Sequence, residues 1–150
     1  EVEGVEVACR WPDTAANPGA FFHVTAGDLT LRGCTFSLAG RPRSTVALAV
    51  QSSQAPGARC RVSHCRLRGQ GLSGLDVSAP AAESLIEGSL LTGAGPVVRV
   101  QASEKPTSLR IVRSTVATAG ELINLAPLPG ERRPGLNVLA WDSLLARTGA

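Results

Sequence analysis

The chain has 150 residues, of which 43% are hydrophobic but only 3% are aromatic, so it is long enough for one domain with a modest core. The formal net charge is +3 and the arginines are mostly scattered, whereas a nucleic-acid interface gathers its basic side chains into a patch. The few aromatic rings also disfavour sites that stack sugars or single-stranded nucleic acid. No apolar run approaches the roughly 18 residues that span a bilayer, so we expect neither a membrane span nor a nucleic-acid partner.

The four cysteines do not form a metal-binding pattern. Cys60 and Cys65 are five residues apart, Cys9 and Cys34 stand alone, and no C-x-x-C pair is present. Structural zinc sites usually combine two closely spaced pairs of ligands. We therefore expect no metal and no cofactor. We expect buried free thiols instead, because cysteine packs like a small hydrophobic residue.

A twelve-residue block recurs along the chain. Its copies cover residues 29–40, 60–71, 84–95, 109–120 and 138–149, each ending in glycine, and residues 2–7 match its middle. The third position of the block is apolar in every copy: Val2, Leu31, Val62, Ile86, Ile111 and Ala140. So is the eighth: Val7, Phe36, Leu67, Leu91, Val116 and Leu145. The alternation around these positions predicts two short strands in each block, each with one face turned inward.

The sixth position of the block is small or carries a thiol in nearly every copy: Val5, Cys34, Cys65, Ser89, Ser114 and Ser143. We expect the cysteines and serines of this column to form a stacked inward ladder, about 4.8 Å from one repeat to the next. The fifth position lies between the two strands, and it holds Gly4, Gly33, His64, Gly88, Arg113 and Asp142. Its glycines predict a bend with positive φ, which histidine and aspartate tolerate better than arginine does.

A third strand is expected after each block. Its inward pairs are Phe22/Val24, Leu48/Val50, Leu75/Val77, Val98/Val100 and Ile123/Leu125. Between the two members of each pair lies one residue whose side chain is expected to point outward. We name these five residues the outward row: His23, Ala49, Asp76, Arg99 and Asn124.

The period distinguishes between repeat architectures. Successive blocks begin 31, 24, 25 and 29 residues apart. Leucine-rich repeats have similar periods, but they need an asparagine or cysteine position and a helical segment that this sequence lacks. The sequence therefore predicts an all-β fold, a right-handed parallel β-helix of about five coils with three short strands each. A β-sandwich is the alternative, although it would not require the same column chemistry in every repeat.

Two of the repeats, DLTLRGCTF at 28–36 and RCRVSHCRLRG at 59–69, resemble coils of the pectin-lyase-like superfamily, which includes bacterial parallel β-helix repeat proteins. The resemblance implies the fold, on which families range from polysaccharide lyases and hydrolases to adhesins. It also implies that catalytic groups, where present, lie on the outer face of one sheet. In this chain that place corresponds to the outward row.

The outward row matches neither enzyme class of the superfamily well. Similar lyases use an arginine or lysine base with carboxylates that hold calcium, and similar hydrolases use two or three aspartates. Asp76 is the only carboxylate of the row, and we expect it to form a surface ion pair with Arg99, worth about 0–1 kcal/mol. The nearest other acidic residues are expected on other faces or turns: Glu83, Glu87, Glu121 and Asp142. Trp11 and Trp141 are expected to shield a loop and a turn.

Two functions remain open from the sequence. The first is a non-catalytic scaffold or binding segment of a larger bacterial protein, whose partner is a polysaccharide or another protein domain. The alternative is part of a carbohydrate-active enzyme, a polysaccharide lyase or a glycoside hydrolase. The fold favours an extracytoplasmic location, whereas unpaired cysteines favour a reducing compartment, so the localisation stays open.

Residues 1–150 form a single β-helix segment in this interpretation. Its first repeat lacks a first strand and its last repeat stops before a third, so we expect a fragment of a longer protein. Open apolar ends and unpaired strand edges template further pairing, and the isolated segment should therefore associate end to end. The core would be open at Val2, Val5 and Val7 on one side and at Val138, Ala140 and Leu145 on the other.

Overall fold

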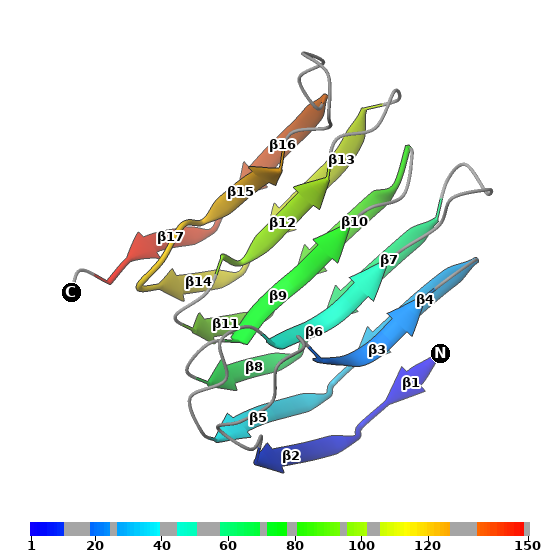
Figure 1. Ribbon diagram of the computed structural model, residues 1–150, viewed down its shortest axis with the longest axis vertical. Coiled ribbons are helices and arrows are strands. Elements are labelled where there is room, and N and C mark those ends of the chain that lie inside the picture. Colours follow the sequence, from blue (N-terminus) through cyan, green and yellow to red (C-terminus); the bar gives the residue numbers. More distant parts are fainter. Residues whose placement is uncertain are drawn as a thin grey trace.

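The computed structural model describes residues 1–10, 19–24, 27–39, 45–50, 58–69, 72–77, 81–93, 96–101, 106–126 and 135–148. The fold in these ranges is all-β and contains no helix, so none there is long and apolar enough to cross a membrane. The described strands form three parallel sheets that together build a β-solenoid (Figure 1). The all-β and parallel-sheet predictions are confirmed, and the β-sandwich alternative is wrong.

Each sheet takes every third strand of the chain. Sheet A contains β1 (Val2–Glu3), β4 (Asp28–Arg32), β7 (Arg59–Ser63), β10 (Glu83–Glu87), β13 (Thr107–Val112) and β16 (Leu136–Trp141). Sheet B contains β2 (Glu6–Arg10), β5 (Thr35–Ala39), β8 (Arg66–Gly69), β11 (Leu90–Gly93), β14 (Thr115–Thr118) and β17 (Leu144–Arg147). Sheet C contains β3 (Gly19–Val24), β6 (Thr45–Val50), β9 (Leu72–Val77), β12 (Val98–Gln101) and β15 (Ile123–Ala126).

The core follows the predicted columns. The third-position residues pair in register across sheet A, and the eighth-position residues do the same across sheet B. Ile86 and Phe36, one from each column, are exposed by 0% and 1%. Phe36 also contacts the rings of Phe21 and Phe22, each at a centroid distance of 5.6 Å. Each such buried side chain contributes about 1.5–3 kcal/mol of transfer free energy.

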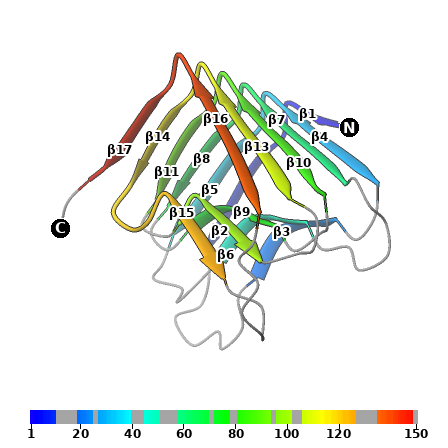
Figure 2. The same ribbon diagram turned by 90° about the horizontal axis from the view of Figure 1, so that it is seen from above.

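A sharp corner joins sheet A to sheet B in every repeat, and it forms the upper edge of the molecule in Figure 2. All six fifth-position residues have positive φ, from 47° at Arg113 and Asp142 to 65° at Gly4. The backbone N–H at this position donates to the carbonyl one repeat on, as from His64 to Glu87 at 2.9 Å. The predicted bend is therefore confirmed, Arg113 included.

The sixth-position residues form the predicted inward column, which we call the hydroxyl–thiol ladder: Cys34, Cys65, Ser89, Ser114 and Ser143. The backbone N–H of Ser89 donates to Ser114 Oγ at 3.1 Å, and that of Cys34 donates to Cys65 Sγ at 3.4 Å. The hydroxyl of Ser114 donates in turn to the carbonyl of Val112 at 2.8 Å. The side chain of each repeat thus pairs a backbone donor of the repeat before it, a donor that would be costly to leave unpaired inside the protein.

Three of the four cysteines can be described, and all three are buried free thiols, as predicted. Burial raises the pKa of the Cys60 thiol to about 12 and also raises the pKa of Cys65. These thiols stay protonated at neutral pH and pack as small apolar groups. The side chain of Cys9 lies outside the described part of the chain.

Candidate functional site

The outward row lies on sheet C in the register that the sequence predicted. His23 pairs with Ala49, Ala49 with Asp76, Asp76 with Arg99 and Arg99 with Asn124, each on neighbouring parallel strands. The side chains of His23 and Ala49 lie outside the described residues. The chemistry of the row can therefore be followed at Asp76, Arg99 and Asn124.

Asp76 differs from the solvent-facing residue that we expected. The residue is only 8% exposed, and its side chain pairs with Arg99, Nη1 to Oδ2 at 3.7 Å. The second carboxylate oxygen, Oδ1, is buried and has no hydrogen-bond partner among the described residues. Burial raises the pKa of this carboxyl group, and the guanidinium of Arg99 offsets part of that rise. The predicted ion pair with Arg99 forms, but Asp76 does not lie on the surface as predicted, because β9 is buried on both faces along its whole length.

Glu121 is an acidic residue outside the strands that nevertheless contacts the outward row. The sequence analysis expected it on another face or in a turn, and it does lie in a turn, from which its Oε2 accepts a hydrogen bond from Asn124 Nδ2 at the end of the row. Glu121 stands in the turn just before β15, where alternation says nothing about direction. Its position three residues before Asn124 is the only sequence signal for this contact.

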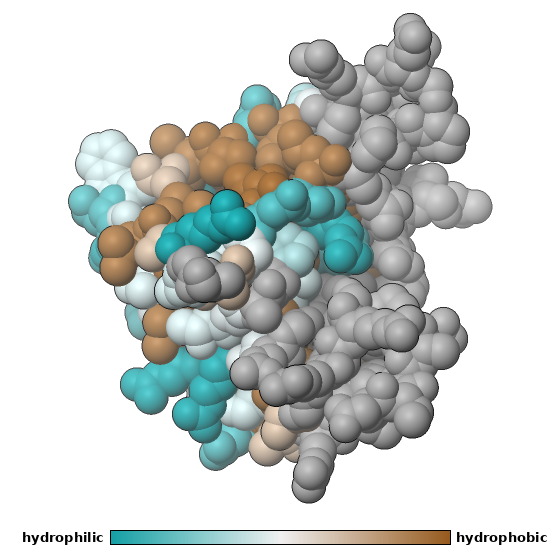
Figure 3. All heavy atoms as spheres, turned by 60° about the vertical axis from the view of Figure 1, so that its left-hand side comes forward, coloured by the Kyte–Doolittle hydropathy of each residue, from teal (hydrophilic) through white to brown (hydrophobic). Residues whose placement is uncertain are grey.

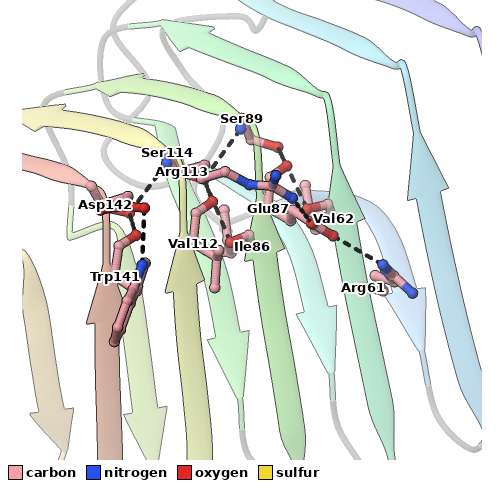
Figure 4. A network of polar contacts seen from close by, with 11 residues as sticks. Arg61, Val62, Ile86, Glu87, Ser89, Val112, Arg113, Ser114, Trp141 and Asp142 are labelled. Carbon is pink, nitrogen blue, oxygen red and sulfur yellow. Dashed lines mark hydrogen bonds and ion pairs between the residues drawn. The ribbon is translucent and has the colours of Figure 1, made fainter.

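The three remaining acidic residues of that prediction, Glu83, Glu87 and Asp142, lie on sheet A or at its corner, as predicted. Glu83 pairs with Arg59 at 3.6 Å. Glu87 lies between two arginines, with Oε2 at 2.9 Å from Arg61 Nη2 and Oε1 bonded to Arg113, as Figure 4 shows. Hydrogen bonds from these two guanidinium groups lower the pKa of Glu87. This network joins three successive repeats along the corner.

The outer face of sheet A carries a shallow groove of about 280 Å³, which the sequence analysis missed. Two rows of side chains border it, Asp28, Arg59, Glu83 and Ser108 on one side and Thr30, Arg61, Leu85 and Arg110 on the other. Arg59 and Arg61 are paired with glutamates, whereas Arg110 forms no ion pair with any described residue. The signal was available, because these rows are the outward positions of the first strand of each block.

The described residues offer a limited set of chemical groups. Asp76 can exchange a proton, and the guanidinium groups on sheets A and C can bind carboxylates. Within the described ranges, no three histidine, cysteine, aspartate or glutamate side chains lie close enough together to hold a metal ion. Comparison with known proteins finds no matching family model, no similar curated protein and no similar solved structure.

Proposed function

We propose that this chain is a non-catalytic scaffold or binding segment of a larger bacterial protein. We further propose that it is a right-handed parallel β-helix of about five coils, related to the pectin-lyase-like superfamily. The recurring order of strands through all three sheets supports the coil count. The right hand is the one that connections between parallel strands of a sheet almost always take.

The observation that carries the proposal is the pairing within the outward row. Asp76 is buried against Arg99, and Asn124 is bonded to Glu121. A glycoside hydrolase needs two carboxyl groups facing each other across the bond that breaks, and a calcium-dependent lyase needs several carboxylates around the ion. The described part of the row offers one buried carboxyl group, which fits a structural role better than either reaction.

One observation favours the alternative, part of a carbohydrate-active enzyme. Asp76 combines a raised pKa, a neighbouring arginine and an orphaned oxygen, and such perturbed groups concentrate at functional sites. If the row were catalytic, Asp76 would be the general acid and Arg99 its positioning partner.

A turnover assay separates the two functions. The purified protein is incubated with polygalacturonate and with alginate, with and without calcium, and release of unsaturated or reducing ends is followed. We expect no turnover above the buffer rate. Turnover that disappears in Asp76→Asn and persists in the matched control Glu83→Gln, on sheet A, would overturn the proposal and establish the enzyme.

A further inference from the structure

The outer faces of the C-terminal strands are unusually apolar. Leu139 and Trp141 on sheet A are 54% and 64% exposed, and Leu144 on sheet B is 62% exposed. Figure 3 shows apolar residues gathered at the upper end of the molecule, over these strands. Their neighbours Val138 and Leu145 belong to the inward columns, and a further repeat stacked on β16 and β17 would cover those two. It would flank Leu139, Trp141 and Leu144 on one side only and leave their outer faces open, because they point away from the core. Leu85, which has a strand on both sides in the same outward line, is still half-buried rather than buried.

The indole of Trp141 is held in place. Its Nε1–H donates to Asp142 Oδ2 at 2.9 Å, a bond drawn in Figure 4. Asp142 is itself fixed in the corner at a φ of 47°, and the carbonyl of Trp141 accepts the N–H of Arg113 at 3.0 Å. A large side chain that is oriented before binding loses less entropy when a partner covers it.

Arg110 lies beside these apolar residues and has no carboxylate partner in the described part of the chain. Its register neighbours across the sheet are Leu85 and Leu139, and the outward residues next to it on β13 are Ser108 and Val112. Arg32, Arg59, Arg61 and Arg113 each pair with a glutamate, whereas Arg110 pairs with no described acidic residue. No described carboxylate therefore competes with an anion that approaches this guanidinium across an aliphatic surface.

We name the corner patch as Arg110, Val112, Leu139, Trp141 and Leu144, and we propose that it binds a protein segment in which a carboxylate stands beside apolar side chains. Tryptophan and arginine are enriched at the energetic centres of protein interfaces, where the surrounding contacts exclude water. A sugar would place its hydroxyl groups against Val112, Leu139 and Leu144, which cannot bond them. The inference rests on the proposed function of a binding segment and names the chemistry of its partner.

Trp141 provides its own reporter. In a Trp11→Phe protein the fluorescence comes from Trp141 alone, and it is titrated with a short capped peptide of alternating leucine and glutamate. The matched probe replaces glutamate with lysine. We expect a saturable blue shift with the glutamate peptide and none with the lysine peptide. Arg110→Ala should weaken binding about tenfold, because hydrogen bonds to charged groups are the strong ones. Arg32→Ala, on the same sheet but outside the patch, should leave binding unchanged.

Reversing the charge at Arg110 tests whether the guanidinium acts through its charge and not through an indirect change in the fold. Arg110→Glu should prefer the lysine peptide, and unchanged circular dichroism would show that the fold is intact. Equal binding of both peptides, no response to either, or no effect of Arg110→Ala would overturn the proposal. So would a shift with cellohexaose, or one that grows with protein concentration alone, which would identify a sugar or a second copy as the occupant. The turnover assay depends on sheet C and not on the patch, so failure here is distinguishable from failure of the proposed function.

Discussion

Asp76 holds a carboxyl group where water reaches it poorly. Its raised pKa means that the folded protein binds the proton of this group more tightly than the unfolded chain does. The pKa of an aspartate in the unfolded chain is about 3.9, so the stabilising contribution of this group is fully present below that pH. This stability is lost as the pH rises from there through the higher pKa of the folded state. In that range the native state binds more protons than the unfolded state, so the free energy of unfolding falls with rising pH.

The substitution Asp76→Asn removes this pH-dependent loss of stability, because an amide does not ionise. The variant should unfold with nearly the same free energy as the wild type at about pH 3. It should then become progressively more stable than the wild type as the pH rises toward neutrality. Urea unfolding at a series of pH values measures the difference, and the other carboxylates cancel because both proteins contain them. A variant that instead loses stability relative to the wild type with rising pH would mean that the Arg99 ion pair outweighs burial.

Arg113 occupies a backbone conformation that suits glycine, with a φ of 47°. Arg113→Gly and Arg113→Ala both remove the guanidinium that bonds Glu87, so they differ only in the backbone. We expect the glycine variant to be more stable than the alanine variant by about 1 kcal/mol, since a side chain in this region costs that much. Chemical denaturation of the two proteins gives the comparison. Equal stabilities would show that the corner bears no backbone strain.

At the scale of elements, the hydroxyl–thiol ladder is what fixes one repeat on the next at the corner. Its side chains are buried at four of five positions, with Ser114 exposed by 3%. The hydroxyl oxygen of Ser114 accepts the backbone N–H of Ser89 at 3.1 Å, so a side chain serves this donor just after the bend. Serine and cysteine share the column because each is small and each supplies an acceptor.

Ser114→Ala should destabilise the protein by about 1–3 kcal/mol, because the N–H of Ser89 is left buried and unpaired. Ser114→Cys should cost less, since Cys65 already fills the same role toward Cys34 at 3.4 Å. The midpoint of guanidinium unfolding at constant slope measures both variants. Alanine and cysteine variants of equal stability would refute the hydrogen-bonding role of the ladder.

These elements could be predicted from the sequence because each position of the block occurs several times along the chain, so its residue type is seen repeatedly. The inward columns, the ladder and the positive φ at Arg113 all followed from position within the block. The burial of Asp76, the contact of Glu121 and the groove beside Arg110 did not. Alternation tells which side of a strand a residue takes, but it does not tell what covers the outer side or where a turn residue points.

At the scale of the whole molecule, the three sheets place equivalent residues of successive repeats in straight lines. Thr30 leads one such line, which continues in register through Arg61, Leu85, Arg110 and Leu139. At the ends of the stack, inward residues are open, with Val5, Val138 and Leu145 exposed by 39%, 44% and 38%. End-to-end association of the isolated chain stays a prediction.

Spin-label distances along this line test the solenoid most directly. Thr30→Cys is combined in turn with Leu85→Cys, Arg110→Cys and Leu139→Cys, in a Cys9→Ser background where the remaining thiols are buried. Electron paramagnetic resonance should give separations near 10, 14 and 19 Å, since each parallel strand adds about 4.8 Å. A series that fails to lengthen by one strand spacing per repeat would contradict the register, and with it the coil count and every surface derived from it.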